Sequence, residues 1–125
     1  MTSLLIPLCI CNLNLDLLRT WKAVCWVESR GDPRAVNLAE SAVGIAQIRR
    51  IMVDDCNRIA GRCKWTYDDR LAPAKSLEMF RTYSLHYWPT GGPEQWARGW
   101  NGGPRGPKRA STLPYWSRVR AAMGE

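Results

Sequence analysis

Apolar residues recur at helical spacing ahead of Gly31 and Pro33, which predicts a helix that begins at Asn12 or Asn14 and ends near Ser29. With about 3.6 residues per turn, one face of this helix carries Leu17, Trp21, Val24 and Glu28. The opposite face carries Arg19, Lys22 and Trp26. The pattern therefore places the carboxyl group of Glu28 on a stripe that is otherwise apolar.

The same periodicity predicts further helices along the chain. One covers residues 49–60 with Gly61 as its left-handed stop, and its inner side carries Met52, Cys56 and Ile59. Another extends from Pro73 to about Trp88 as core scaffold, with one side formed by Leu77, Phe80, Ser84 and Tyr87. A short helix contains Trp96, and residues 62–72 are polar and turn-rich. We expect a mainly α fold with little or no β structure, in one compact domain spanning residues 1–125.

The first residues form an apolar arm, residues 1–12, of which residues 2–11 are expected to pack on the core. This arm has no Lys or Arg before Arg19, contains Pro7, and is shorter than the roughly 18 apolar residues that a membrane span needs. It therefore resembles neither a signal peptide nor a transmembrane helix.

Composition and charge restrict the class of partner. With 46% hydrophobic and 23% charged residues, the chain is not of disordered composition. Its net charge of +7 indicates a polyanionic partner, for which nucleic acid, an acidic membrane surface and cell wall all qualify. The basic residues available for nucleic acid are dispersed among Gly and Pro: Arg98, Arg105, Lys108, Arg109, Arg118 and Arg120. No nucleic-acid partner is therefore expected.

The cysteines, Cys9, Cys11, Cys25, Cys56 and Cys63, are odd in number, so at least one is unpaired or bridges to another chain. Cys56 and Cys63 could close a short disulfide loop, and two reduced thiols beside a helix end are an equal alternative. Cys9 and Cys11 resemble half of a metal site, but no second pair follows and His86 is the only histidine. We expect no metal and no other cofactor.

Glu28 is the candidate for chemistry. A carboxyl in apolar surroundings can keep its proton near neutral pH and donate it to a leaving group, whereas a Glu at a fraying helix end would turn to water. Ser29 follows it directly, and Gly44-Ile-Ala-Gln47 places one uncharged amide among small and aliphatic residues. Further on, Gly99-Trp-Asn-Gly-Gly103 has a backbone that allows close approach of a ligand, or forms an ordinary turn.

Taken in order, these segments resemble the lytic transglycosylase SLT domain of the lysozyme-like superfamily over roughly residues 14–123. The family's Glu-Ser pair matches Glu28-Ser29, and its Gly-Leu-Met-Gln segment matches residues 44–47, with Ala46 in place of Met. Its Ala-Tyr-Asn-Ala-Gly segment matches residues 99–103, with Trp100 as the aromatic residue. Its final motif, a Tyr on the last helix that reaches the acid, matches Tyr115, which alone would be interpreted as a core aromatic.

The resemblance implies a peptidoglycan-cleaving enzyme without a cofactor. Glu28 would protonate the bond between N-acetylmuramic acid and N-acetylglucosamine, and then take the proton of the muramoyl C6 hydroxyl as a 1,6-anhydro ring closes. Ser29, Gln47 and Asn101 would hold the substrate and orient Glu28, Trp100 would line the cleft, and Tyr115 would hydrogen-bond near the acid. The partner would be the glycan strand, and the protein would act at the cell wall as a monomer in a phage or bacterial setting.

Two other interpretations stay open. A hydrolytic muramidase of the goose-lysozyme type would need a second acid to direct water, and Glu40 is the candidate for that role. Asp54 and Asp55 are expected on the exposed side of the second helix. A catalytically silent wall-binding or virion module would keep the same fold and charge.

Overall fold

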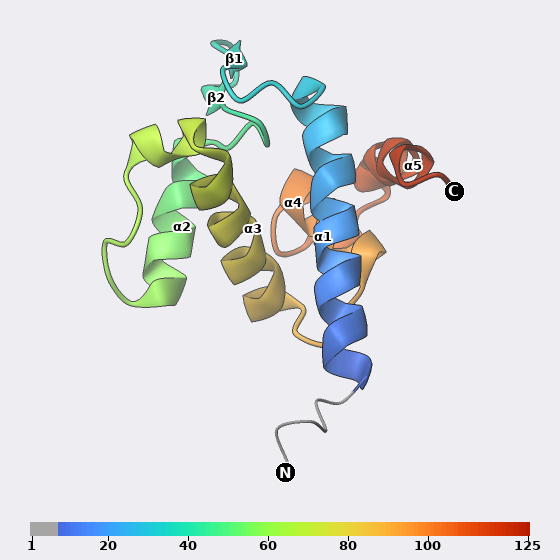
Figure 1. The fold of residues 1–125 in the computed structure, drawn as a ribbon. Helices are drawn as coiled ribbons and strands as arrows, with labels where there is room; N and C mark the ends of the chain where they lie inside the picture. The colour runs from blue at the N-terminus through green and yellow to red at the C-terminus, as the bar shows by residue number, and fades with distance from the viewer. Residues whose placement is uncertain (1–7) are drawn as a thin grey trace.

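The structure, a computed structural model, describes residues 8–125, with side chains from residue 15 onward. Its α-helices are α1 (Leu8–Ser29), α2 (Arg50–Ala60), α3 (Pro73–Tyr87), α4 (Pro93–Gly102) and α5 (Leu113–Ala122). A hairpin pairs the antiparallel strands β1 (Val36–Asn37) and β2 (Ala42–Val43). Short 3-10 helices cover Tyr67–Leu71, Gly106–Lys108 and Ala110–Thr112. The expected mainly α single domain is confirmed (Figure 1).

Helix α1 begins at Leu8, so the expected start at Asn12 or Asn14 is wrong. No Gly or Pro occurs between Leu8 and Gly31, so nothing in the chain interrupts the helix over this length. Residues 8–12 of the predicted arm are therefore helical, and residues 1–7 lie outside the described part. At the other end Gly31 adopts a left-handed φ of 77°, and its N–H donates to the Cys25 carbonyl at 3.2 Å, which ends the helix as expected.

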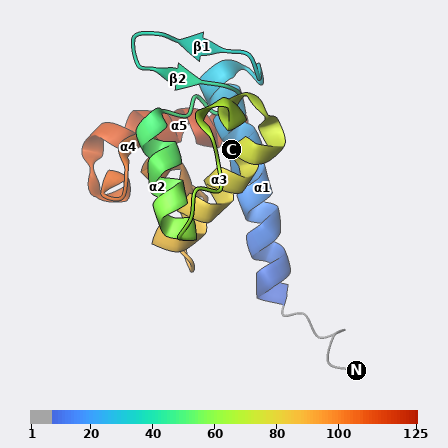
Figure 2. The same cartoon turned by 90° about the vertical axis from the view of Figure 1, so that its left-hand side faces the viewer.

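The predicted apolar stripe of α1 is the centre of the core. Leu17, Trp21 and Val24 are buried, while Arg19, Lys22 and Trp26 on the opposite face are exposed. Helices α4 and α5 pack against α1, as does α3 (Figure 1). Figures 1 and 2 both place the hairpin at the end of the molecule where α1 terminates, far from the N-terminus. Glu28, in the last turn of α1, is thus carried to the same end as the hairpin.

Helices α2 and α3 agree with prediction in their extents and differ in detail on their inner faces. Gly61 ends α2 with a φ of 76°, as expected. In α2, the fully buried side chains are Val53 and Cys56. The inner face is therefore centred one position after the predicted Met52. The buried face of α3 is shifted from the predicted one: Phe80 and Ser84 are buried together with Ser76, Met79 and Tyr83, whereas the predicted Leu77 and Tyr87 are only half-buried.

Arg70 fixes the turn between the hairpin and α2, although it lies in a segment predicted only to be polar. Its side chain is buried, and its guanidinium donates to the carbonyls of Ser41 at 3.2 Å and Ile48 at 3.1 Å. Gly44 has a φ of 89°, and a Cβ at this position would overlap the Arg70 carbonyl oxygen. The backbone of residues 44–48 is therefore held against Arg70, which positions Gln47.

Cys25, Cys56 and Cys63 are free thiols in the described part of the chain, so of the two alternatives for Cys56 and Cys63 the reduced one holds. Cys56 is buried in the core beneath α3, whereas Cys63 is exposed beyond the end of α2. None of the described helices is long and apolar enough to cross a membrane.

We predict that Leu17→Ala lowers the free energy of unfolding by about 2 to 4 kcal/mol, because it leaves a cavity beneath α1. Leu17 is 4% exposed, and its neighbour Leu18, at 40% exposed, provides the matched control on the same helix. Leu18→Ala should cost less than about 1 kcal/mol. Urea denaturation of both variants measures the difference, and equal losses would contradict the assigned face of α1.

Candidate active site

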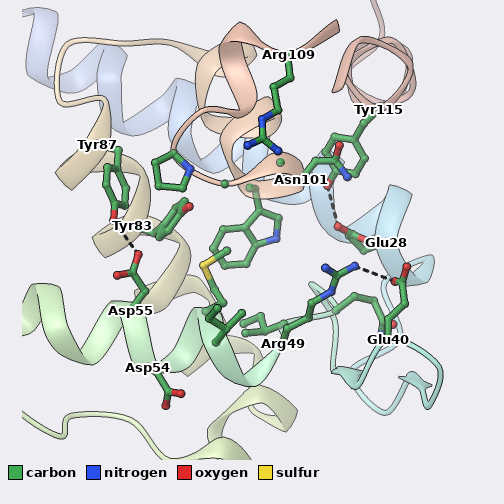
Figure 3. Close-up of a pocket in the computed structure, with 18 of the residues that line it drawn as sticks. Glu28, Glu40, Arg49, Asp54, Asp55, Tyr83, Tyr87, Asn101, Arg109 and Tyr115 are labelled. Atoms are coloured by element: carbon green, nitrogen blue, oxygen red, sulfur yellow. Dashed lines mark hydrogen bonds and ion pairs between the residues drawn. The ribbon is translucent and has the colours of Figure 1, made fainter. Parts of the chain in front are cut away.

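A cleft of about 960 Å³ opens between the end of α1, the start of α2, the end of α4 and α5. Of the predicted site residues, those that line it are Glu28, Gln47, Trp100, Asn101 and Tyr115. Figure 3 shows Glu28, Tyr115 and Asn101 along one side of this cleft and Asp55, Tyr83 and Tyr87 at its other end. The folded chain thus brings together residues from segments that are far apart in the sequence.

Glu28 is half-buried at the cleft wall rather than turned out to water. The Tyr115 hydroxyl, itself buried, donates a hydrogen bond of 3.0 Å to Glu28 Oε2. Burial raises the pKa of Glu28 from its ordinary 4.5 to about 7. The Tyr115 hydrogen bond lowers the pKa, Glu40 raises it, and Arg49 and Arg118 lower it. Near neutral pH this carboxyl is therefore able to exist in both its acid and its base forms.

Ser29 does not line the cleft, and its hydroxyl is used within the protein. The hydroxyl lies 2.7 Å from the Ile45 carbonyl, to which it donates, and accepts a hydrogen bond of 3.1 Å from the Asp32 N–H. These contacts join the end of α1 to the turn that holds Gln47. The Ser29 hydroxyl is therefore used to hold this junction, and Ser29 is not among the residues that line the cleft.

Gln47 adopts a left-handed φ of 52°, and its Nε2 donates to the carbonyls of Ala35 at 3.1 Å and Gly44 at 3.0 Å. Its amide therefore braces the turn while the side chain lines the cleft. Ala46, which stands where the family has Met, is fully buried, and its carbonyl accepts a hydrogen bond of 3.3 Å from Trp100 Nε1.

Trp100 and Asn101 lie in the last turn of α4 and contribute differently. Trp100 is only 6% exposed and packs edge-on against Phe80 and Tyr83, with centroids 5.1 and 5.8 Å apart. It therefore forms the floor of the cleft rather than a free aromatic platform. Asn101 is exposed at the rim of the cleft.

The other acids of the cleft are engaged by neighbouring groups. Glu40 pairs with Arg49 at 3.3 Å, and Asp54 accepts a hydrogen bond of 2.8 Å from the Tyr67 hydroxyl. Asp55 accepts a hydrogen bond of 2.8 Å from Tyr87 and pairs with Arg58. Asp54 is exposed, as expected, whereas Asp55 is half-buried, and both line the cleft.

Sequence reasoning did not identify several residues of the cleft: Arg49, Arg58, Arg109, Arg118, Tyr83 and Tyr87. They come from different elements, so no motif spacing connects them. The available signals were weak: Arg49 follows Gln47 closely, and Tyr83 and Tyr87 are one helical turn apart. Within residues 15–125, no cluster of three His, Cys, Asp or Glu side chains could hold a metal ion.

Among known families, the model of the transglycosylase SLT domain matches residues 15–112. The matched segment contains Glu28, Gln47 and Asn101 and ends before Tyr115. No curated protein matches the chain.

The raised pKa of Glu28 predicts a pH-dependent cost in stability. Between pH 4.5 and about 7 the unfolded chain ionises Glu28 while the folded chain keeps the proton, so the free energy of unfolding falls as pH rises. Relative to wild type, Glu28→Gln should gain stability across this window, by at most about 3 kcal/mol above pH 7. Denaturation of both proteins from pH 4 to pH 8 measures this. A difference that stays constant with pH would contradict the raised pKa.

Proposed function

Because the chain belongs to the family of transglycosylase SLT domains, we propose that it is a lytic transglycosylase acting on peptidoglycan. Its substrate would be the β-1,4 bond between N-acetylmuramic acid and N-acetylglucosamine, and its product a 1,6-anhydromuramoyl end. The observation that carries the proposal is the partly buried Glu28 carboxyl at the cleft wall, with a pKa raised to about 7 and a buried tyrosine hydroxyl bonded to it.

In the first step, protonated Glu28 donates its proton to the glycosidic oxygen as the bond from that oxygen to the muramoyl C1 breaks. The N-acetylglucosamine part leaves as an alcohol, and positive charge develops at C1. A pKa near the working pH suits this task, because the acid is both populated and able to release its proton.

In the second step, the muramoyl C6 hydroxyl attacks C1 and the Glu28 carboxylate takes the hydroxyl proton. The 1,6-anhydro ring closes, the carboxyl is protonated again, and no water is consumed. The attacking oxygen belongs to the same sugar as C1, so its attack benefits from proximity that bulk water lacks. One carboxyl therefore serves as acid and then as base.

The remaining site residues would position the acid and the sugar. Tyr115 directs the Glu28 carboxyl through its hydrogen bond, and Ser29 fixes the end of α1 against residues 44–47. Gln47 and Asn101 would present polar groups to the glycan strand, over a floor formed by Trp100. We propose that the protein acts as a monomer at the cell wall.

The hydrolase alternative is less well supported because it needs a second carboxylate to direct water. Glu40, its candidate, is paired with Arg49, and the other cleft acids are engaged by Tyr67, Tyr87 and Arg58. A silent wall-binding module would not need a partly buried carboxyl with a raised pKa, which lowers stability at neutral pH.

Glu28→Gln should lower the rate of cell-wall lysis at least about a hundredfold, because the amide keeps the shape of the side chain and has no proton to donate. Loss of turbidity in a cell-wall suspension measures activity, and circular dichroism confirms the fold. Glu78→Gln, the same chemical change on α3 outside the cleft, should keep wild-type activity. Near-full activity of a folded Glu28→Gln protein would refute the role of Glu28.

The products should be 1,6-anhydromuramoyl fragments, lighter by one water than hydrolysed fragments and without a reducing end. Mass spectrometry of the digested wall, before and after borohydride reduction, distinguishes the two product types. Reducible muramic acid ends whose formation depends on Glu40 would instead establish the hydrolase.

A further inference from the structure

Glu40 and Arg49 form an ion pair at the cleft wall beside Glu28, and the proposed reaction gives neither residue a role. The Arg49 Nη2 lies 3.3 Å from Glu40 Oε2, and both residues line the cleft together with Glu28. Figure 3 shows the Arg49 guanidinium directed to the side of the cleft where Glu28 and Glu40 lie. Two carboxyl groups therefore face a single guanidinium.

The backbone structure around Glu40 and Arg49 brings their side chains together. Glu40 lies in the loop of the hairpin, where its N–H donates to Asn37 Oδ1 at 3.3 Å. Val43 and Ile48 exchange two backbone hydrogen bonds of 3.1 and 3.0 Å, which fold the hairpin against the start of α2, where Arg49 is the residue before the first turn. The buried Arg70 guanidinium donates hydrogen bonds to the Ser41 carbonyl in the hairpin loop and to the Ile48 carbonyl before α2, and so holds the two segments together.

We propose that Glu40 is a positioning residue: it holds the Arg49 guanidinium in an ion pair, so that Arg49 does not pair with Glu28 and the acid keeps its proton. A pair with both side chains 55% exposed contributes little to folding stability, so its consequence is electrostatic. This inference uses the proposed function only in so far as Glu28 must be protonated to act.

The charges that face Glu28 make the direction of the effect clear. Glu40 from the hairpin raises its pKa, and Arg49 before α2 lowers it. From α5, Arg118 and the Tyr115 hydroxyl lower it, and Cys25 is the titratable neighbour on α1 itself. Without Glu40, Arg49 would be free to turn to Glu28, so both changes would favour the ionised carboxylate. Without Arg49, the pKa of Glu28 would rise.

The test is a pH titration of the Glu28 carboxyl by ¹³C NMR of glutamate-labelled protein, with Glu28→Gln to assign the signal. Glu40→Gln should lower the pKa of Glu28 by about half a unit or more, and Arg49→Gln should raise it. In the double variant, Glu40→Gln with Arg49→Gln, the pKa of Glu28 should return close to its wild-type value, because the two charges have opposite effects on it. Glu78→Gln, which removes an ion-paired glutamate outside the cleft, should leave the titration unchanged.

The pH dependence of wall lysis gives a second readout. If Glu28 is the acid, the alkaline limb of the rate profile should move to lower pH in Glu40→Gln. In the double variant this limb should return to its wild-type position. The rate at the pH optimum should stay at the wild-type level in both. An unchanged Glu28 titration in Glu40→Gln overturns the inference, as does loss of activity at every pH, which would place Glu40 in the reaction itself. A titration that shifts while the rate profile stays fixed upholds the ion-pair inference and refutes Glu28 as the acid.

Discussion

The hydrogen bond between Tyr115 and Glu28 joins two side chains that are 87 positions apart in the sequence. The cleft depends on the helix packing that brings these two side chains together. A carboxyl near the core is costly unless a polar partner compensates it. Tyr115 can compensate it because α5 packs directly on α1, with the Tyr115 ring buried and its hydroxyl directed to the carboxyl. The apolar stripe of α1 thus does two things: it holds the helices together and it sets the environment of the acid at its end.

The turn of residues 44–48, which carries Gln47, is held by polar contacts to backbone carbonyls in addition to the packing of Ala46 and Ile48 in the core. Ser29 binds the Ile45 carbonyl, Gln47 binds that of Gly44, and Arg70 binds that of Ile48. Three side chains from three parts of the chain thereby fix one short turn, in which Gly44 permits the close approach of the Arg70 backbone. Short segments without regular structure are usually mobile, and these contacts explain how this one can present Gln47 in a defined place.

Features that depend on local periodicity were predictable from the sequence, whereas features that depend on long-range contacts were not. The stripe that ends at Glu28 and the stop at Gly61 are local signals, and both are confirmed. Helix α1 begins earlier than predicted, because the asparagines that could cap it, Asn12 and Asn14, lie inside an uninterrupted helical run. The hairpin strands have two residues each, too few to show alternation, so the nearness of Glu40 to Arg49 had no sequence signal. The contact between Tyr115 and Glu28 could be predicted only from the resemblance to a family, because no local pattern connects the two residues.

In the proposed reaction the Glu28 carboxyl gives a proton and then takes one back in the same turnover, so it cannot be strongly biased to either form. Burial alone would hold Glu28 protonated and make it a poor acid, since it would release its proton reluctantly. The tyrosine hydrogen bond and the nearby arginines act against burial, and the pKa of about 7 is the balance between them. The proton of Glu28 is therefore controlled by groups from α5, the hairpin and the start of α2, which makes the acid a property of the assembled cleft and not of α1 alone.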